Sequence, residues 1–474
     1  MSILDVDATT LAHKIKAHAI RSEEAVNAYI QQIKRINPVV NCLVEERFAQ
    51  AMEEAKQADR KVDSHEAKGR LFGVPISMKE AFDVAGMHTT GGLKHRSSVK
   101  AAHDAEVVAR LKAEGAIILG KTNTPALCFC QETDNKLFGR TNNPWNPSRT
   151  AGGSSGGEGA LIAVGGAAVG LGSDIGGSIR FPSHFNGVIG FKSGAGMVSQ
   201  HGHFPFVDEP LQEKMLGIGA IAKSVQDTRL LNSIIARKVP PGLDLNGFQI
   251  VIPHLLPIYQ VDKATRSCVR EIKETLAENF EVVSDFPPFF AESTDLWQLI
   301  MSIDGGSSIA RLAFGERASR YHMEYVKEAL FGKSDWHSYL TWALIGANLF
   351  KPNQEKIGDI RNTCEKALPQ ICSYLQHRLL IMPVYHTTAL PHGTVYREIF
   401  SVRKTYRMVL PFITYANTWG LPALTVPVAI DAEGLPIAVQ IVSCCGNEDA
   451  IFQMGELFES NFRGYVRCTQ YDEV

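Results

Sequence analysis

Apolar and polar residues follow helical spacing through the first sixty positions of the chain. Ser22-Glu23-Glu24 forms a cap and an acidic first turn for a helix over Ala25–Ile36. We expect this helix to end before Pro38, because proline disfavours helical backbone in the residue that precedes it. A second helix is predicted from about Glu45 to Ala58. The same spacing predicts further helices over 104–114, 158–164, 225–236 and 262–280.

Between these helices lie short apolar runs with the length of buried strands. They cover Phe72–Met78, which leads into Lys79, then 116–119 and 167–171, and finally two runs within 421–442 joined by a hairpin-like turn at 431–434. The alternation of helices and buried strands predicts an α/β fold. The chain has no internal repeat and no low-complexity linker. We therefore expect one large domain, with a mixed, mostly parallel, twisted sheet covered by helices on both faces.

Composition and charge narrow the function classes. The 474 residues are 45% hydrophobic and 21% charged, and the formal net charge of −2 gives no electrostatic basis for binding nucleic acid. The longest apolar run, 160–172, is too short to span a membrane, and the N-terminus lacks a signal-peptide pattern, so we expect a cytoplasmic protein without a transmembrane segment. The nine cysteines lack zinc-site spacing. We expect reduced, buried thiols, no metal and no other cofactor.

Two loops bounded by glycines carry the strongest chemical signal. The first, Gly152–Gly157, contains Ser154, and the second, Ser173–Arg180, contains Ser178, 24 positions after Ser154. Glycine lets backbone N–H groups converge on one point, where they can hold a negative oxygen. A serine among such donors is a candidate nucleophile for acyl transfer.

Two shorter motifs match other enzyme classes but lie in the wrong context. Gly115–Thr122 satisfies the phosphate-loop pattern, yet its middle residues favour a buried strand, and Pro125 discourages the helix that such a loop needs. Gly152–Gly156 satisfies G-x-S-x-G, yet a loop precedes it where the nucleophile elbow of α/β-hydrolases needs a strand. In that fold His386 or His392 would be the base, and we interpret both as polar loop histidines.

Taken together, these residues resemble the amidase signature family. The resemblance is dense from about Gly73 to Ser199 and weaker over most of the remaining chain. The matched segments are 73–80, 115–125, 139–144, the double-serine loop and 172–182, and Lys79 precedes Ser154 by 75 positions. Within the family the chain is most similar to the fatty-acid amide hydrolase branch, on residues 157–160, 173–175 and 185–187.

Some positions of the chain separate it from other family members. Glu158 stands where many of them carry a small residue, and Lys192-Ser193 replaces the usual Lys-Pro in a loop beyond Ser178. On this resemblance the single domain divides into N-terminal helices (1–65), a signature core (66–230), a variable helical substrate region (231–400), and C-terminal strands and a helix that return to the core (401–474).

The resemblance implies a Lys–Ser–Ser triad that acts through an acyl-enzyme. Ser178 would be the nucleophile, Ser154 the proton shuttle and Lys79 the base, and the bond Gly153–Ser154 would be cis. A lysine is a base only when neutral, so burial must lower its pKa from the reference value of about 10.4. Lys79 follows an apolar strand, which is consistent with a buried amine. We therefore expect an alkaline activity optimum.

Further site residues follow from the same resemblance. The oxyanion hole would consist of the backbone N–H groups of Ile175, Gly176, Gly177 and Ser178. Ser155 would support the shuttle by a hydrogen bond or be part of the loop only. Asp174 would steady the nucleophile loop by accepting hydrogen bonds from backbone or Arg180, or be purely structural. The carbonyl of Cys128, beside Phe129 and Cys130, would receive the substrate N–H, or the loop would serve core packing.

The substrate is expected to be a small-molecule amide with a hydrophobic or fatty acyl group. The acyl channel would be bordered by an aromatic-rich stretch that contains Trp336, Tyr339, Leu340, Trp342, Leu344, Ile345, Leu349 and Phe350. The alternative interpretation of this stretch is plain helix packing. The alternatives are a short-chain or aryl amidase, a glutaminase subunit of an amidotransferase, and a binding protein without catalysis. None of the three triad residues is missing, which argues against the last. Peripheral membrane contact and a homodimer stay open.

Overall fold

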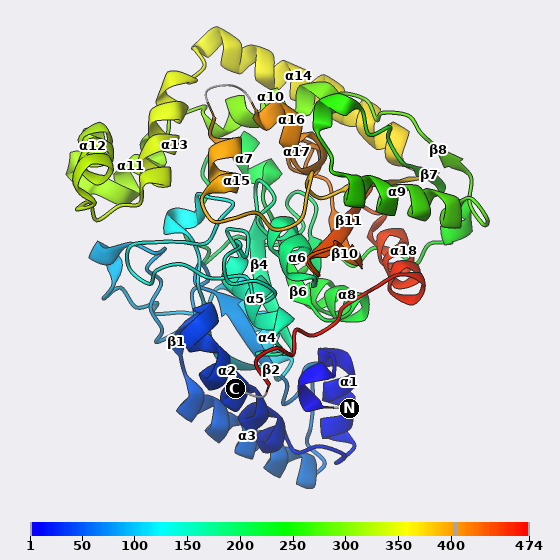
Figure 1. The fold of residues 1–474 in the computed structure, drawn as a ribbon. Coiled ribbons are helices and arrows are strands. Elements are labelled where there is room, and N and C mark those ends of the chain that lie inside the picture. The colour runs from blue at the N-terminus through cyan, green and yellow to red at the C-terminus, as the bar shows by residue number, and fades with distance from the viewer. Residues whose placement is uncertain (1, 402–404, 473–474) are drawn as a thin grey trace.

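The computed structural model describes residues 2–401 and 405–472, and one sheet runs through its centre (Figure 1). The strands are β1 (Leu43–Glu46), β2 (Pro75–Lys79), β3 (Ile117–Thr122), β4 (Val169–Asp174), β5 (Ile189–Lys192), β6 (Gly217–Ala222), β7 (Gln249–Val251), β8 (Val282–Val283), β9 (Arg378–Pro383), β10 (Ala423–Ile430) and β11 (Pro436–Val442). Within the described ranges they form one eleven-stranded sheet in the order β1-β3-β2-β4-β6-β5-β10-β11-β9-β7-β8.

Parallel and antiparallel pairing occupy different parts of this sheet. Strands β3, β2 and β4 run parallel to one another, and so do β9, β7 and β8. The other neighbours among the described strands pair antiparallel. The prediction of an α/β fold with a mixed sheet is therefore confirmed. Parallel pairing is limited to two blocks, because the β10–β11 hairpin and the strands β5 and β6 reverse the direction between them.

Helices cover both faces of the sheet. They are α1 (Ala8–Lys16), α2 (Ser22–Val40), α3 (Phe48–Asp63), α4 (Glu106–Ala113), α5 (Gly156–Ala163), α6 (Arg180–Asn186), α7 (Pro210–Met215), α8 (Val225–Ile235), α9 (Lys263–Leu276), α10 (Phe290–Met301), α11 (Ser307–Phe314), α12 (Tyr321–Phe331), α13 (Ser338–Leu349), α14 (Gln354–Leu375), α15 (Thr394–Ile399), α16 (Tyr406–Val409), α17 (Pro411–Thr418) and α18 (Glu448–Asn461). The helices predicted over 104–114, 158–164, 225–236 and 262–280 are thus confirmed as α4, α5, α8 and α9.

Strand β9 shows how the two faces are divided. Its residues Leu379 and Ile381 belong to a buried cluster with α9 and α18, whereas Leu380 and Met382 belong to a second cluster with α6 and α14. Because successive side chains of a strand point to opposite faces, these clusters are separate layers of core on either side of the sheet. The segment 231–400, predicted as helical, therefore also contributes the strands β7, β8 and β9.

The N-terminal region departs from the prediction at two points. Helix α2 continues through Pro38 to Val40, since a proline in the last turn interrupts little of the helix. Ahead of α3, residues 43–46 form β1 instead of the start of a helix. This strand pairs antiparallel with β3, a partner more than seventy positions away, so local spacing gives no sign of it.

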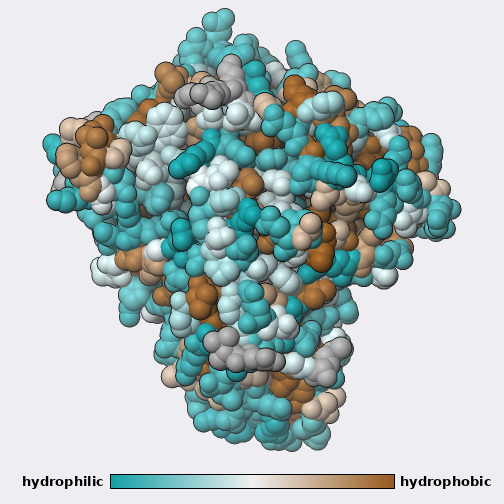
Figure 2. All heavy atoms as spheres, viewed as in Figure 1, coloured by the Kyte–Doolittle hydropathy of each residue, from teal (hydrophilic) through white to brown (hydrophobic). Residues whose placement is uncertain are grey.

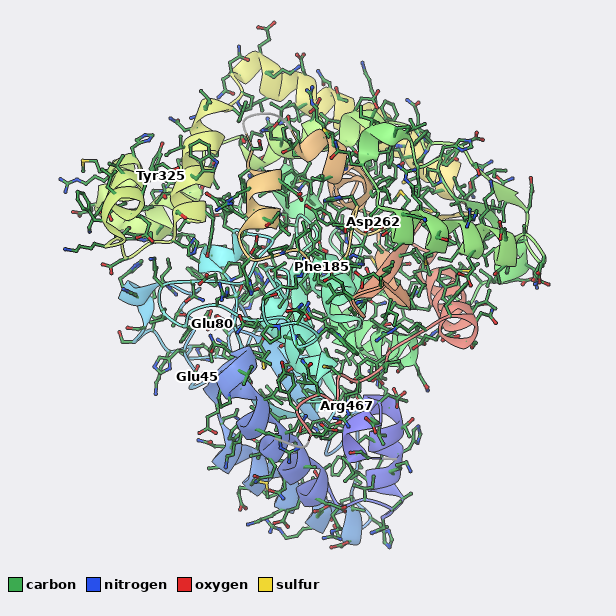
Figure 3. All side chains as sticks on the ribbon, viewed as in Figure 1. Glu45, Glu80, Phe185, Asp262, Tyr325 and Arg467 are labelled. Carbon is green, nitrogen blue, oxygen red and sulfur yellow. The ribbon has the colours of Figure 1, made fainter. Side chains whose placement is uncertain are left out.

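The two ends of the described chain meet at the base of the molecule (Figure 1). Arg467, labelled in Figure 3, donates to Asp5 and to Asp472. Figure 2 shows hydrophobic residues at the upper left, where Figure 1 labels α12, and this helix exposes Met323, Val326, Leu330 and Phe331. In the described part of the chain, no helix has both the length and the apolar character needed to cross a bilayer.

Candidate active site

Lys79 ends strand β2 inside the molecule, and all five residues of that strand are buried. Its Nζ lies 2.6 Å from Ser154 Oγ and 2.9 Å from Ser173 Oγ. Burial lowers the pKa of Lys79, because a charged amine loses its hydration there, and the nearby Cys128 side chain opposes this shift. Glu80, the residue after Lys79, is labelled in Figure 3 and shows where the end of β2 lies, between the N-terminal helices and Phe185 of α6. The amine is thus buried against two hydroxyl groups.

Ser154 lies in the tight loop that precedes α5. The peptide bond Gly153–Ser154 is cis. A side chain at Gly153 would come within 2.7 Å of the backbone of Cys130 and Glu132, so only glycine fits between these segments. The Ser154 carbonyl accepts a hydrogen bond from Thr124 Oγ1 at 3.0 Å. Contacts from several segments therefore hold the hydroxyl that faces Lys79.

Ser178 lies in the loop between β4 and α6, and Asp174 organises this loop from within. Its carboxylate accepts hydrogen bonds from the Gly177 N–H at 2.8 Å and the Ile179 N–H at 3.2 Å, and Arg180 Nε donates to it at 3.0 Å. Burial alone would raise the pKa of Asp174, but the adjacent charge of Arg180 holds it well below the usual range. The loop is thus built around an ionised, buried pair.

Arg180 connects this loop to distant parts of the chain. It is fully buried and donates to the Ile413 carbonyl at 2.8 Å, to Gln440 Oε1 at 2.9 Å and to Asn417 Oδ1 at 2.5 Å. The first serine loop is attached as well, since the Ser155 N–H donates to the Ser178 carbonyl at 3.1 Å. The Ser155 hydroxyl itself points to the Ser173 carbonyl, 3.4 Å away.

The two candidate serines face the same cavity. Within the described residues their hydroxyl groups are not hydrogen-bonded to each other, and Ser178 Oγ is open to the cavity. Of the predicted oxyanion donors, the Gly177 N–H is already engaged by Asp174. The N–H groups of Ile175, Gly176 and Ser178 make no hydrogen bond to another described residue. Among the predicted oxyanion donors they are therefore the N–H groups that no described residue engages, and their role stays a prediction.

Ser178 stands where two cavities adjoin. One of them, which we call the apolar cavity, extends under α10, α13 and α15 and includes Trp297, Trp342, Ile345 and Phe400. The other contains the polar groups of Ser154, Ser173 and His203, and we call it the polar cavity for these groups, although apolar side chains such as Phe206 and Leu312 make up much of its wall. Both are bordered by Cys128, Phe129, Ile175, Ser178 and Met301. Cys128 is half-buried and follows Leu127 in left-handed backbone, with φ of 57° and 55°.

Helix α13 divides the predicted acyl-channel residues into two groups. Trp342, Ile345, Leu349 and the following Phe350 border the apolar cavity. On the other side of the helix Leu340 and Leu344 are fully buried in a cluster with α11. The remaining two, Tyr339 and Trp336, belong to this packing side, where Trp336 stacks on Phe314. The packing interpretation is therefore confirmed for one face, and the other face borders a cavity, where the acyl channel stays a prediction.

Several residues of this region were not identified from the sequence. Ser173 lies within the second glycine loop, five positions before Ser178, so its proximity could have been inferred from that motif. Trp297 donates its Nε1–H to the Ile175 carbonyl at 2.9 Å, and Gln131 Nε2 donates to the Gly176 carbonyl at 3.2 Å. His203 contacts Ser173. Nothing in the local sequence marks the last three residues.

The shorter motifs adopt other structures. Within the Gly115–Thr122 segment, Ile117–Thr122 forms β3. Lys121 is buried, and its Nζ donates to the His88 carbonyl and to Thr89 Oγ1. His386 contacts Glu398, and His392 contacts the Pro147 carbonyl; neither borders the two cavities.

Cysteines and metal-ligating side chains show no assembled site. The nine cysteines are free thiols; Cys445 is exposed and three others are half-buried, so the expectation that all are buried was wrong. Across residues 2–401 and 405–472, no group of three or more His, Cys, Asp or Glu could hold a metal ion.

Comparison with known proteins identifies the family of this chain. The family model described as Amidase matches residues 24–452. The chain belongs to the amidase family. This amidase is 32% identical over 499 positions to fatty-acid amide hydrolase 2-B of Danio rerio, in a match that covers 98% of this chain and 91% of the relative. It is 29% identical to one subunit of the glutamyl-tRNA(Gln) amidotransferase of Lachnospira eligens, over 97% of this chain and 98% of the relative.

A solved structure shares the whole fold of this amidase. The structure of 6-aminohexanoate cyclic dimer hydrolase complexed with substrate covers 99% of each chain with a TM-score of 0.81 and 24% identity. The family and these relatives make the protein an amide hydrolase.

Proposed function

We propose that this amidase cleaves linear amides with a hydrophobic acyl group through an acyl-enzyme on Ser178, with Ser154 as proton shuttle and Lys79 as base. The observation that carries the proposal is the buried Lys79 amine, hydrogen-bonded to Ser154 beside the cavity that Ser178 faces. The lowered pKa of Lys79 supports it, because a neutral amine can take up a proton.

In the first step the Ser178 oxygen attacks the amide carbon. The Ser178 proton passes to Ser154, whose own proton passes to Lys79. The resulting oxyanion accepts hydrogen bonds from the N–H groups of Ile175, Gly176 and Ser178, and one such donor typically lowers the barrier by about 3 kcal/mol. Lys79 then returns its proton through Ser154 to the leaving nitrogen, and the carbon–nitrogen bond breaks.

In the second step water enters the vacated place of the amine. It attacks the acyl carbon and gives a proton to Ser154, whose own proton passes to Lys79. Lys79 then returns a proton through Ser154 to Ser178 as the acid leaves. Ester substrates would pass through the same acyl-enzyme, so ester cleavage is an expected side activity.

The positions of Ser154 and Ser178 orient the substrate. Ser154 borders the polar cavity and not the apolar one, whereas Ser178 borders both. Since Ser154 must reach the leaving nitrogen, the amine part occupies the polar cavity. The acyl part then extends into the apolar cavity, past Phe129 and Trp297 toward Ile345.

The walls of the apolar cavity support a hydrophobic acyl group. Its described lining includes Phe129, Met301, Trp342, Leu349 and Phe400. Each methylene that leaves water against such a surface gains about 0.8 kcal/mol. The α-ammonium and α-carboxylate groups of glutamine would instead lose hydration among these side chains. Hydrolysis of a hydrophobic amide is therefore favoured over glutaminase activity.

The test is hydrolysis of primary amides of graded acyl length, with Ser178→Ala as the blank and glutamine as a separate substrate. We expect kcat/KM to rise with chain length and glutamine to be a poor substrate. Rates that are flat or fall beyond acetamide would replace this proposal by the short-chain or aryl amidase. A fluorophosphonate adduct on a residue other than Ser178 would overturn the assignment of the nucleophile.

A further inference from the structure

A buried histidine continues the polar contacts of Lys79 on the side away from Ser154. His203 Nε2 lies 2.9 Å from Ser173 Oγ, and Ser173 Oγ lies 2.9 Å from Lys79 Nζ. The other ring nitrogen, Nδ1, lies 3.0 Å from the Pro205 carbonyl oxygen. These contacts form an uninterrupted chain from a backbone carbonyl to the amine.

The chain determines where each proton lies. A carbonyl oxygen only accepts, so the His203 proton is on Nδ1 and Nε2 carries a lone pair. Nε2 therefore accepts the hydroxyl proton of Ser173. The Ser173 oxygen is left with lone pairs only, and it accepts an N–H of Lys79. Burial is the main cause that lowers the pKa of His203 to about 3, and Lys79 contributes only when its amine is protonated, so the ring keeps this neutral form.

This arrangement decides how a neutral Lys79 is oriented. A neutral amine has two N–H groups and one lone pair. With one N–H donated to Ser173, the lone pair is free to accept the hydroxyl proton of Ser154, 2.6 Å away. If the Ser173 hydroxyl could rotate, its proton could occupy the same lone pair and block the transfer from Ser154.

We propose that His203 is a positioning residue which, by accepting the Ser173 proton, keeps the lone pair of Lys79 directed at Ser154. The inference rests on the proposed role of Lys79 as the base. It adds Ser173 and His203 as groups that orient the base, and neither of them takes up or gives a proton in the reaction.

The fold places the histidine beside the strand that carries the base. The residues after Lys79 pair with the loop around His203, through the Phe204 N–H on the Ala81 carbonyl at 2.7 Å and an antiparallel bridge between Phe82 and His203. The Phe82 and His203 rings also meet edge to face, with centroids 5.1 Å apart. The base and its positioning residue are therefore held by one backbone pairing.

Two variants of similar size and polarity separate this role from mere packing. In His203→Gln the amide oxygen reaches the Nε2 position and can accept from Ser173. In His203→Asn the shorter amide reaches only the Nδ1 position. We expect His203→Asn to lower kcat about tenfold with KM unchanged, the size of one lost hydrogen bond, and His203→Gln to stay within about threefold of wild type. His201→Gln, at an exposed position of the same loop, is the control and is expected to be fully active.

A double variant tests whether the effect passes through Ser173. We expect Ser173→Ala with His203→Asn to be no slower than Ser173→Ala alone, since the histidine then has nothing to orient. Three outcomes would overturn the inference. They are a kcat loss in the double variant equal to the product of the two single losses, an equal kcat loss in His203→Asn and His203→Gln, and an unchanged kcat in His203→Asn. If Lys79→Met keeps the wild-type rate, the proposed function itself fails; if Lys79→Met is inactive while His203→Asn is fully active, only the positioning role fails.

Discussion

Helix α13 allows substrate preference and stability to be changed separately at neighbouring positions. Ile345 borders the apolar cavity, whereas Leu344 is fully buried between α13 and α11. We therefore expect Ile345→Ala to lower activity on long-chain amides without unfolding the protein. We expect Leu344→Ala to destabilise the fold without changing chain-length preference.

The size of the Ile345 effect follows from the surface that is removed. The substitution deletes three carbon atoms, and at about 0.8 kcal/mol per buried methylene the upper limit is about 2.4 kcal/mol, or about 60-fold in kcat/KM. Ile345 forms one part of the cavity wall and is partly covered by protein. We therefore expect less than half of this limit, about 1 kcal/mol or fivefold, on a fatty amide and no change on acetamide. Leu344→Ala should cost about 2–5 kcal/mol of unfolding free energy.

The assay is kcat/KM across acyl lengths for both variants, beside denaturant unfolding of each. A fivefold loss that is equal on acetamide and on a fatty amide would refute the placement of the acyl chain against α13. Loss of stability in Ile345→Ala comparable to that in Leu344→Ala would refute the division of this helix into two faces.

Three further predictions concern the site and its supports. Lys79 must be neutral to act as a base, and burial lowers its pKa below the ordinary lysine value of about 10.4. We therefore expect kcat/KM to fall as the pH drops through this lowered pKa, and Lys79→Met to abolish the pH dependence. A maximum of kcat/KM in acid would contradict the prediction. Asp174→Asn leaves the buried Arg180 charge unpaired and should cost about 3–5 kcal/mol in urea unfolding. Since the pKa of Asp174 is lower in the folded state than in the unfolded state, the wild-type protein should lose the stability that this pair contributes only as the pH falls below about 3.9. An Asp174→Asn variant that is as stable as wild type at pH 7 would refute this account of the pair. Gly170→Ala places a methyl group 2.1 Å from Glu158 Oε2 and 2.9 Å from Ser77 Oγ and should cost about 1–3 kcal/mol of unfolding free energy. The same substitution should cost less in a Glu158→Ala background, and an equal cost in both backgrounds would mean that another contact is responsible.

The sequence allows the core of the site to be predicted because its residues come from glycine-rich loops with fixed spacing. Ser154 and Ser178 lie in such loops, and Lys79 ends an apolar strand whose period is visible locally. Residues 45 and 46 of β1 fall within the helix predicted from about Glu45, because a strand of four residues depends on its distant partner β3 and has no local signal. The sequence does not identify His203 for the same reason. Its position next to the strand of Lys79 comes from pairing with residues 81–83 and not from its neighbours in the chain.

The position of the oxyanion donors shows a similar limit. The glycine loop predicts several inward N–H groups, but the Asp174 side chain occupies the one at Gly177. Whether a given N–H faces the cavity or a carboxylate depends on one rotamer, which residue spacing does not specify. The sequence likewise shows α13 as an apolar stretch. Which face of the helix borders a cavity depends on how α10, α13 and α15 pack together, and this cannot be seen in the sequence.

The partners of Arg180 have a consequence for the protein during its synthesis. The guanidinium that steadies the nucleophile loop donates to Ile413, Asn417 and Gln440, which lie 233 to 260 positions later in the chain. All three residues of the proposed triad are translated long before these anchors exist. A growing chain should therefore stay inactive toward amides until residues 413–440 have been made and have folded. A protease that cleaves within this segment should inactivate the finished enzyme without touching its serines.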